Sequence, residues 1–413
     1  MPPQSTVGLT MADIYSPEYT VDPYPLFHRI RDVSPVFWDQ RMGVDGAWMV
    51  TGYEAALAVF RNPKLSALRP QWNPNGPDAL VRDEEFAGQL RALHSMMFTA
   101  DPPAHTRLRR IARKPFVPAA VARMRGEIEA AAHELLDAVL PSGRMDYMED
   151  FAMALPSTTM CRVLGIPVAD RGLVWRRILS WGLVVDGGPL SKENPEYHLG
   201  KVGKYMDYFR EQLGKRRVQR TDDLLQSLVD SWDEGEFISE EELLGNLMFL
   251  LTAGQVTTGH QIGNSTLALL AHPDVLATLR ADPTRVPDAT PELMRYDCSV
   301  QLTKRRAVEH MELAGQRIEQ GQELFVWMGA ANRDPEPFPD PDRLDPDRPK
   351  VQNLALGNGI HYCAGGQLGQ LLNEVAVTVF AERVRNPRVD PAEVVRKPVP
   401  TFRGAHSIPM TFD

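Results

Sequence analysis

The chain of 413 residues is 43% hydrophobic and 24% charged, which is the composition of a soluble globular protein with a sizeable core. Its formal net charge of −9 argues against nucleic acid as a partner, because a phosphate backbone needs a basic face. The sequence opens without a basic and apolar leader and contains no run of about 18 apolar residues, so we expect no secretory signal and no membrane span.

Cysteine usage fits a cytoplasmic protein. The three cysteines, Cys161, Cys298 and Cys363, are odd in number and far apart, so they do not suggest a disulfide framework. A reducing compartment is consistent with such usage. We therefore expect a soluble protein of the cytoplasm.

The N-terminal part alternates helices, strands and one long loop. Residues 21–39 are typical of a short helix followed by a strand, and residues 47–62 of a strand followed by a helix. Residues 65–103 include a stretch rich in proline, asparagine and glycine, and loops of this length are often functional. From about residue 106 to residue 270, amphipathic spacing predicts mostly helix.

One predicted helix is unusually long. Ser239 and Glu242 form a capping-box signature before an apolar stretch, and no proline follows until Pro273. That spacing allows roughly 32 residues, or on the order of 48 Å, and the apolar content predicts burial. Its middle, residues 253–259, reads AGQVTTG, which is locally unfavourable for a buried helix. Such departures from local rules tend to fall at functional sites.

The final third changes character. Residues 304–328 alternate with turns at Gly315 and Gly321, which predicts strands. Residues 331–349 are dense in proline and charge, which predicts an ordered irregular segment or a linker. A glycine-rich loop, a cysteine and a helix then follow. The predicted fold class is mainly α with a smaller β region.

Cys363 is the first candidate for chemistry. Gly357, Gly359 and His361 precede it and Gly365 follows, so the backbone can turn sharply and approach a flat ligand. A cysteine just before a helix lies at the positive end of the helix dipole, which favours the thiolate. The alternative is a small buried cysteine in a turn. A zinc site with His361 is disfavoured, because no second ligand pair has usable spacing.

Glu292 and Arg295 lie three residues apart and share one face of a predicted helix. Alone, such a pair is usually a surface ion pair of small energetic value. If it is buried, it needs further partners, and Arg343 in the proline-rich segment is our candidate third member.

His105 and Arg109 also share a helix face, being four residues apart. With Arg305 they could hold the carboxylates of a ligand through charge-assisted hydrogen bonds. The alternative is that each is an ordinary solvated basic residue.

Together these segments resemble the cytochrome P450 superfamily of haem-thiolate monooxygenases. LGNGIHYCAG resembles its haem-binding loop, Glu292-x-x-Arg295 its K-helix pair, and PDRL at 341–344 its meander segment. DPPAHTRLRR is similar to its propionate-contacting helix, and AGQVTT to its oxygen-activating segment. The motifs follow the family order over nearly the whole chain.

The resemblance implies one haem-thiolate domain over residues 1–413, with the P450 fold and the haem between the long central helix and the helix after the cysteine. It implies haem b with its iron bound to Cys363, and a small-molecule substrate. Electrons would come from NAD(P)H through a ferredoxin reductase and a ferredoxin. The haem contacts that it implies are His105, Arg109, Ala253, Gly254, Arg305, Leu356, Gly357, His361 and Gly365.

The resemblance also implies a substrate pocket above the haem. It would be formed by the 65–100 loop, the central helix, the segment 300–302 and a residue near the C-terminus. The candidate pocket residues are Gln71, Trp72, Phe249, Val300, Gln301, Leu302 and Phe402. Gln71 and Trp72 would suit an aromatic or amide-rich substrate, and the alternative for both is ordinary loop packing.

The sequence departs from the family at the oxygen-activating segment. The usual acid before the threonine is Val256, while Thr257 remains. Valine cannot relay a proton, so Gln255, Thr258, His260, ordered water or the substrate would substitute; the alternative is a tolerated variation. Leu356 stands where the family usually has phenylalanine, and Gln370 where it usually has arginine.

These features favour hydroxylation of a small molecule in bacterial secondary metabolism, with Thr257, Val256 and Gln255 as the catalytic positions. The altered acid position raises a second reading, radical coupling of aromatic substrates, such as dimerisation of tryptophan-containing diketopiperazines. A reading of another class is a non-catalytic haem-binding sensor.

Overall fold

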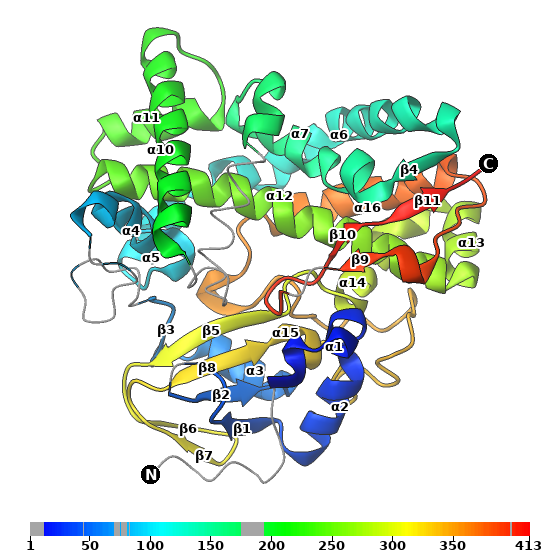
Figure 1. The fold of residues 1–413 in the computed structure, drawn as a ribbon, viewed down its shortest axis with the longest axis horizontal. Helices are drawn as coiled ribbons and strands as arrows, with labels where there is room; N and C mark the ends of the chain where they lie inside the picture. The colour runs from blue at the N-terminus through cyan, green and yellow to red at the C-terminus, as the bar shows by residue number, and fades with distance from the viewer. Residues whose placement is uncertain are drawn as a thin grey trace. The chain divides into compact units, whose positions relative to one another are not determined.

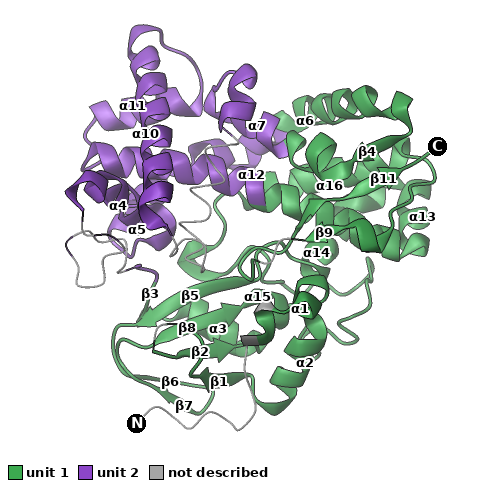
Figure 2. Ribbon diagram, in the orientation of Figure 1, with its two compact units in different colours: residues 1–66, 123–155, 257–413 green, residues 67–122, 156–256 purple. Residues whose placement is uncertain are grey.

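The computed structural model describes residues 12–43, 45–69, 75, 81, 83–174, 194–396 and 399–413 (Figure 1). Two compact units can be distinguished in it (Figure 2). Unit 1 comprises residues 1–66, 123–155 and 257–413, and unit 2 comprises residues 67–122 and 156–256. Our expectation of a single domain stays a prediction.

Unit 1 contains the main sheet, which has five strands in the order β1-β2-β8-β5-β3. β2 and β8 are parallel, and the other neighbouring strands are antiparallel. Three two-stranded sheets pair β4 with β11, β6 with β7 and β9 with β10. The strands are β1 (Val36–Asp39), β2 (Ala47–Val50), β3 (Leu65–Ser66), β4 (Arg144–Asp146), β5 (Leu302–Ala307), β6 (Met311–Leu313), β7 (Gln316–Ile318), β8 (Glu323–Trp327), β9 (Val395–Arg396), β10 (Ala405–Ser407) and β11 (Pro409–Thr411).

Helices contribute more residues than strands in both units, and α6, α7 and α12 contribute residues to each. In unit 1 they are α1 (Pro17–Val21), α2 (Tyr24–Val33), α3 (Tyr53–Arg61), α13 (Pro273–Ala281), α14 (Val286–Tyr296), α15 (Met328–Ala331) and α16 (Gly366–Arg383). In unit 2 they are α4 (Ala87–His94), α5 (Ala104–Ala112), α10 (Pro195–Val218) and α11 (Leu224–Asp233). The shared helices are α6 (Pro118–Val139), α7 (Ala154–Leu164) and α12 (Glu240–Ala271).

Short 3-10 turns link these helices. They are η1 (Ala12–Tyr15), η3 (Glu84–Phe86), η4 (Met97–Thr99), η5 (Lys114–Phe116), η6 (Leu140–Ser142), η8 (Val168–Asp170), η9 (Pro283–Arg285), η10 (Gly359–His361) and η11 (Pro391–Glu393). A single π-helical turn, η7 (Met148–Ala152), precedes α7. Of these turns, η4, η7 and η10 lie beside the segments that carry the candidate site residues.

The prediction of one long buried helix is confirmed by α12, which has 32 residues. Its N-terminus is capped as the sequence predicts, because the Ser239 hydroxyl accepts a hydrogen bond from the Glu242 N–H at 3.1 Å. The Glu242 carboxylate reaches back to the Ile238 N–H at 3.0 Å and also binds Arg107. The Glu242 N–H is one of the donors that a helix start leaves open, and the Ser239 hydroxyl satisfies it.

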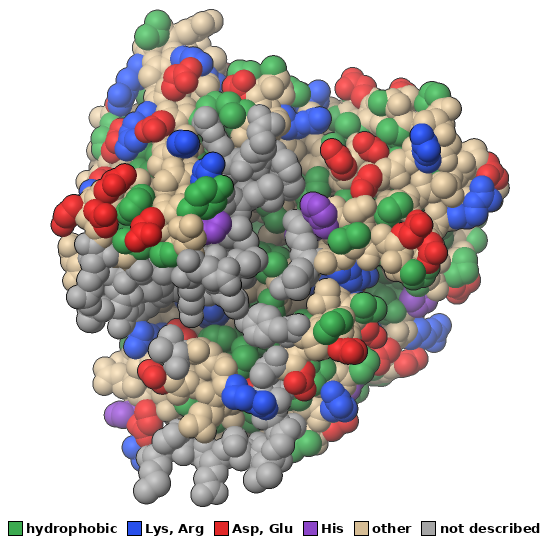
Figure 3. All heavy atoms as spheres, viewed as in Figure 1, with side chains coloured by type: hydrophobic (Ala, Val, Ile, Leu, Met, Phe, Trp, Pro, Cys, Tyr) green, Lys and Arg blue, Asp and Glu red, His purple; other side chains and the backbone are tan. Residues whose placement is uncertain are grey.

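The predicted helices and strands of the N-terminal part and of the final third are also confirmed. Residues 304–328 contain β5 to β8, and Gly315 and Gly321 take positive φ angles of 74° and 87° at the turns. The class is therefore mainly α with a smaller β region. Of the helices in the described ranges, none is long and apolar enough to cross a membrane. On the face drawn in Figure 3, acidic and basic side chains are interspersed rather than gathered by sign.

Candidate active site

The loop before Cys363 depends on two glycines with left-handed backbone. Gly357 and Gly359 both have φ of 69°, which side chains rarely adopt. A Cβ on Gly359 would lie 2.3 Å from the Phe60 carbonyl oxygen of α3, so this position also requires close approach. Asn358 caps η10 through its Oδ1, which accepts from the Gly359 N–H at 2.8 Å and from Arg61 at 3.2 Å. The loop is therefore held by unit 1 itself.

Cys363 is presented at the start of a helix. Its N–H donates to the Leu356 carbonyl at 2.9 Å, and α16 begins three residues later, capped by Gly365. The cysteine is exposed, and it lies just before the positive N-terminal end of an 18-residue helix. Cys161 and Cys298 are fully buried, and burial raises the pKa of their thiols to about 11 and about 12. Cys363 is thus the cysteine whose position suits a thiolate ligand.

The helix after Cys363 packs against α12 beside Thr257. A Cβ on Gly369 would lie 3.8 Å from the Thr258 hydroxyl oxygen. Farther along both helices, Val377 and Ala381 share a hydrophobic cluster with Leu269. Unit 1 therefore brings the first turn of α16, which follows the cysteine loop, beside the α12 residue next to Thr257.

The middle of α12 is polar and tightly packed. A Cβ on Gly254 would lie 2.6 Å from the Met160 sulfur of α7, so glycine permits this close approach. Ala253, Val256 and Thr257 are half-buried. Gln255 is fully buried, and neither polar atom of its amide has a hydrogen-bond partner among the described residues. Burying an amide without hydrogen-bond partners costs free energy, so this side chain is suited to bind an ordered water or a polar group of a ligand.

Unit 2 carries three more of the candidate residues. His105 is buried and Arg109 half-buried on α5, one turn apart as predicted. Phe249 of α12 is half-buried and stacks on Phe98, with ring centroids 5.0 Å apart and planes at 12°. The pocket candidates Gln71 and Trp72 lie outside the described residues.

Arg305 lies in unit 1, on β5. It is 6% exposed, and its guanidinium lies 5.7 Å from the centre of the Phe60 ring. The backbone carbonyl of the same Phe60 lies against Gly359 in the cysteine loop. The Arg305 Nη1 also donates to the Lys304 carbonyl at 2.8 Å. The guanidinium of Arg305 is therefore a buried cation that lies on Phe60, the residue that contacts the cysteine loop.

The four remaining pocket candidates form part of one ribbon. Val300 pairs with Phe402 in an antiparallel bridge, and both side chains are half-buried. Gln301 is 1% exposed, donates to the Cys298 carbonyl at 2.7 Å and presses against Gly329. Leu302 is a core residue packed in a cluster with Phe27 and Trp327. Of these four, Val300 and Phe402 are therefore the accessible ones.

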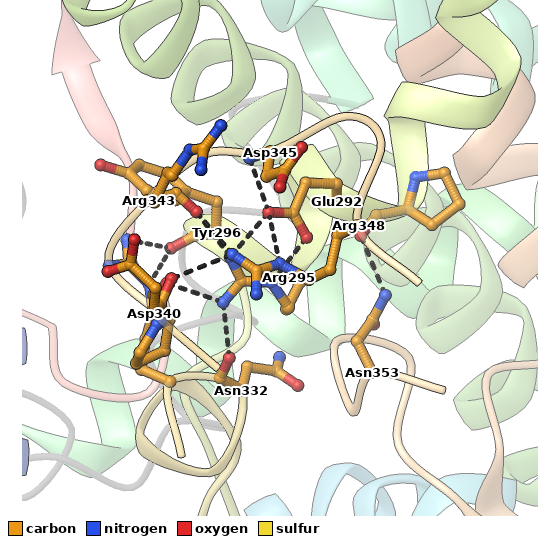
Figure 4. Close-up of polar contacts among 12 residues, drawn as sticks. Glu292, Arg295, Tyr296, Asn332, Asp340, Arg343, Asp345, Arg348 and Asn353 are labelled. Atoms are coloured by element: carbon orange, nitrogen blue, oxygen red, sulfur yellow. Dashed lines mark hydrogen bonds and ion pairs between the residues drawn. The ribbon is translucent and has the colours of Figure 1, made fainter. Parts of the chain in front are cut away.

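The Glu292–Arg295 pair is buried, and most of its network is shown in Figure 4. Arg295 binds both oxygens of Glu292 at 2.7 and 2.8 Å and donates to the carbonyls of Asn332 and Pro341 at 2.9 Å. The third side chain is Arg348, whose Nε lies 3.1 Å from the Glu292 carboxylate.

Our choice of Arg343 as the third side chain needs correction. Arg343 is exposed and contributes only its carbonyl oxygen, which accepts from Arg295 at 3.3 Å and from Arg348 at 2.9 Å. The tripeptide Pro-Asp-Arg occurs twice here, at 341–343 and at 346–348. Local sequence could not decide between the two arginines, because only the fold determines which one turns inward.

Comparisons with known proteins agree with this arrangement. A family model described as Cytochrome P450 matches residues 200–383. The chain is 36% identical to the cytochrome P450 monooxygenase PikC of Streptomyces venezuelae over 95% of this chain and 92% of PikC. It is 34% identical to the 6-deoxyerythronolide B hydroxylase of Saccharopolyspora erythraea over 98% and 99% of the two chains. The solved structure of the cytochrome P450 enzyme CxnD, for C–S bond formation in chuangxinmycin biosynthesis, matches with a TM-score of 0.83 and 31% identity over 94% of each chain.

The chain therefore belongs to the cytochrome P450 family and has its fold. Members of this family are oxidoreductases that carry haem iron. The residues present fit that cofactor. Haem iron is bound in proteins by a side chain such as a cysteine thiolate, and the exposed Cys363 at the start of α16 would be a ligand of that kind. Among the described residues, no group of three or more His, Cys, Asp or Glu side chains is placed to chelate a metal ion directly.

Proposed function

We propose that this protein hydroxylates a small organic molecule of bacterial secondary metabolism, with haem b held through the Cys363 thiolate. The observation that carries the proposal is the close approach of Gly369 to Thr258, because it puts the first turn of the helix after Cys363 beside the α12 turn that contains Thr257, within one unit. The hydroxylase and monooxygenase names of the two curated relatives support the reaction type.

Each candidate residue has a proposed role toward the haem. Haem held by the Cys363 thiolate would supply the oxidising chemistry, because thiolate ligation favours O–O cleavage. His105, Arg109 and Arg305 would bind the propionates by charge-assisted hydrogen bonds. Ala253 and Gly254 of α12 would line one face. Leu356, Gly357, His361 and Gly365 would frame the other.

Protons for the reaction would have to be delivered without the usual acid, because Val256 stands at its position. Thr257 offers a hydroxyl that can both donate and accept a hydrogen bond. Val256 offers neither, so the hydrogen bonds must continue through water or through a polar group of the substrate. The buried amide of Gln255 would orient such a water, because both of its polar atoms need partners.

The substrate would contact Phe249, Val300 and Phe402, with Gln71 and Trp72 supplying a polar group and a stacking surface. Electrons would pass from NAD(P)H through a ferredoxin reductase and a ferredoxin. The sequence contains no flavin or iron–sulfur segment of its own, which is why we propose separate carriers.

The first experiment tests the thiolate and turnover together. Holoprotein reduced under carbon monoxide should show the red-shifted Soret band of thiolate ligation, and Cys363→Ala should abolish it. With surrogate ferredoxin and reductase, steady NADPH consumption with product is expected for an enzyme. A haem protein that passes the spectral test and never consumes NADPH in a broad substrate screen would instead be a sensor.

A second candidate function is oxidative coupling of aromatic substrates, such as dimerisation of tryptophan-containing diketopiperazines. Two observations favour it: Val256 replaces the acid, and the similar protein CxnD is described as forming a C–S bond. A substrate N–H would supply the missing hydrogen bond. Loss of one hydrogen atom from each of two substrate molecules would leave delocalised radicals that couple, with dioxygen as the oxidant, two electrons from the external carriers, and water as its product.

Turnover under labelled dioxygen separates the two reactions. A product that carries one labelled oxygen atom supports hydroxylation, and a dimer without label supports coupling. Val256→Glu gives a second check, since restoring the acid should increase hydroxylation at the expense of the dimer. An unchanged dimer yield in this variant would show that valine does not select the outcome.

A further inference from the structure

Two buried amides of α12 bind the ribbon that carries Val300 and Phe402. Gln261 and Asn264 are 4% and 0% exposed and lie three residues apart, on one helix face. Both side-chain nitrogens donate to the carbonyl of Asp297, at 3.2 and 3.3 Å. The Gln261 Oε1 accepts from the Ser299 N–H at 3.0 Å, directly before Val300.

The second strand of the ribbon is held by the same helix. The Asn264 amide nitrogen also donates to the Arg403 carbonyl at 3.0 Å, next to Phe402. The Arg403 N–H in turn donates to the Ser299 carbonyl at 2.8 Å. Each side of the Val300–Phe402 bridge is therefore tied to α12 through a residue adjacent to it.

This attachment lies one helical turn from Thr257. Thr257 and Gln261 are four residues apart on α12, which is about 6 Å along the axis, on the same face. From Gln261 the connection passes through Ser299 to Val300, and all of these residues belong to unit 1.

We propose that Gln261 and Asn264 are positioning residues that set the space between the Thr257 turn and the Val300–Phe402 ribbon, and so decide how large a group the substrate site accepts there. This inference rests on the proposed function. A core role alone would call for apolar side chains, because a buried amide is costly wherever one of its polar atoms lacks a partner, as the Asn264 Oδ1 does among the described residues. Apart from a bond from the Gln261 amide nitrogen to the Ser265 hydroxyl at 3.3 Å, the bonds of the two amides go to the backbone on both sides of the bridge, so the amides control its position.

The test compares two haem ligands that need no knowledge of the substrate. Imidazole binds iron and reaches little beyond it, whereas 4-phenylimidazole extends into the surrounding site. Dissociation constants are measured from the Soret shift of the holoprotein. Gln261→Met keeps the length of the side chain and removes its hydrogen bonds. We expect it to change the ratio of the two constants by at least about fivefold, equivalent to about 1 kcal/mol, with imidazole binding itself unchanged.

Gln226→Met is the matched control. Gln226 is also 4% exposed, but its amide bonds only to Thr221 and Asp230 around α11 in unit 2. It should lower stability without changing the ligand ratio. Gln261→Asn, which shortens the amide, should shift the ratio in the same direction as Gln261→Met.

The outcomes separate this inference from the proposed function. If wild-type holoprotein gives no thiolate spectrum, the proposed function fails first. If the spectrum is normal and both Gln261 variants keep the wild-type ratio within twofold, the positioning role is overturned. If both Gln261 variants lose haem while Gln226→Met retains it, the two amides have a structural role only. That result would also overturn the positioning role.

Discussion

Asp297 and Arg403, which are 106 residues apart in the chain, form a buried ion pair with the Asp297 Oδ1 2.6 Å from the Arg403 Nε. The Tyr24 hydroxyl donates to the same oxygen at 2.8 Å. Burial by itself raises the pKa of Asp297, but Arg403 and these hydrogen bonds hold it below its usual value. The pair secures the base of the ribbon that Gln261 and Asn264 bind.

Asp297→Asn should therefore cost about 3–5 kcal/mol of unfolding free energy at neutral pH, because it leaves a buried guanidinium without its charge partner. The folded pKa is depressed, so this stabilisation is present above the unfolded value of about 3.9 and is lost as the pH falls through the folded value. Urea unfolding of wild type and variant should show a constant difference down to about pH 4 and a shrinking one below it. The control is Asp413→Asn, in an exposed pair with Arg388. A difference that grows in acid would contradict the assignment.

Arg348→Ala should destabilise the protein far more than Arg343→Ala. The Arg348 side chain binds Glu292 and three backbone carbonyls in a nearly buried setting, whereas the Arg343 side chain is exposed. Removing Arg348 strands part of a buried charge network, at about 3 kcal/mol or more, while an exposed substitution stays within about 0.5 kcal/mol. Thermal unfolding and haem content of the two variants give the comparison. Equal losses of thermal stability and haem in the two variants would show that the Arg343 side chain also belongs to the network.

Gly359→Ala and Gly357→Ala form a matched pair, because both glycines have φ of 69°. Each substitution should cost about 1–2 kcal/mol for left-handed backbone. At Gly359 the new Cβ also meets the Phe60 carbonyl at 2.3 Å, whereas at Gly357 the nearest atom is 3.9 Å away. Only Gly359→Ala should displace the cysteine loop and lower haem occupancy strongly. Equal haem occupancy in the two variants would show that the loop tolerates the contact.

Alkylation should distinguish the three cysteines. Iodoacetamide applied to haem-free protein at about pH 8 should label Cys363, which is exposed, and spare the two buried thiols. Burial raises the pKa of Cys161 to about 11 and of Cys298 to about 12, so few thiolates are present there. Peptide mass analysis locates the label, and reconstitution with haem should protect Cys363. Labelling of Cys298 ahead of Cys363 would contradict the ligand assignment.

Local sequence determined the elements that carry the site. The Ser239 cap and the absence of proline between it and Pro273 were enough to predict α12. The ends of a helix depend on hydrogen bonds to nearby residues, which local sequence specifies. The glycines around Cys363 predicted a tight loop before a helix for the same reason, and the positive φ angles of Gly357 and Gly359 bear this out.

Tertiary structure alone decided which side chains meet. Arg348 rather than Arg343 completes the Glu292 network, although both stand in the same tripeptide. The position of Gln301 in the chain predicts a pocket residue. In the fold, its amide nitrogen donates to the Cys298 carbonyl, and its amide oxygen packs against Gly329. The bond from Gln261 to Ser299 joins residues 38 apart, and no local pattern specifies it. Contacts of this kind depend on how separate elements pack, because the same side chain costs or gains free energy according to what burial places beside it.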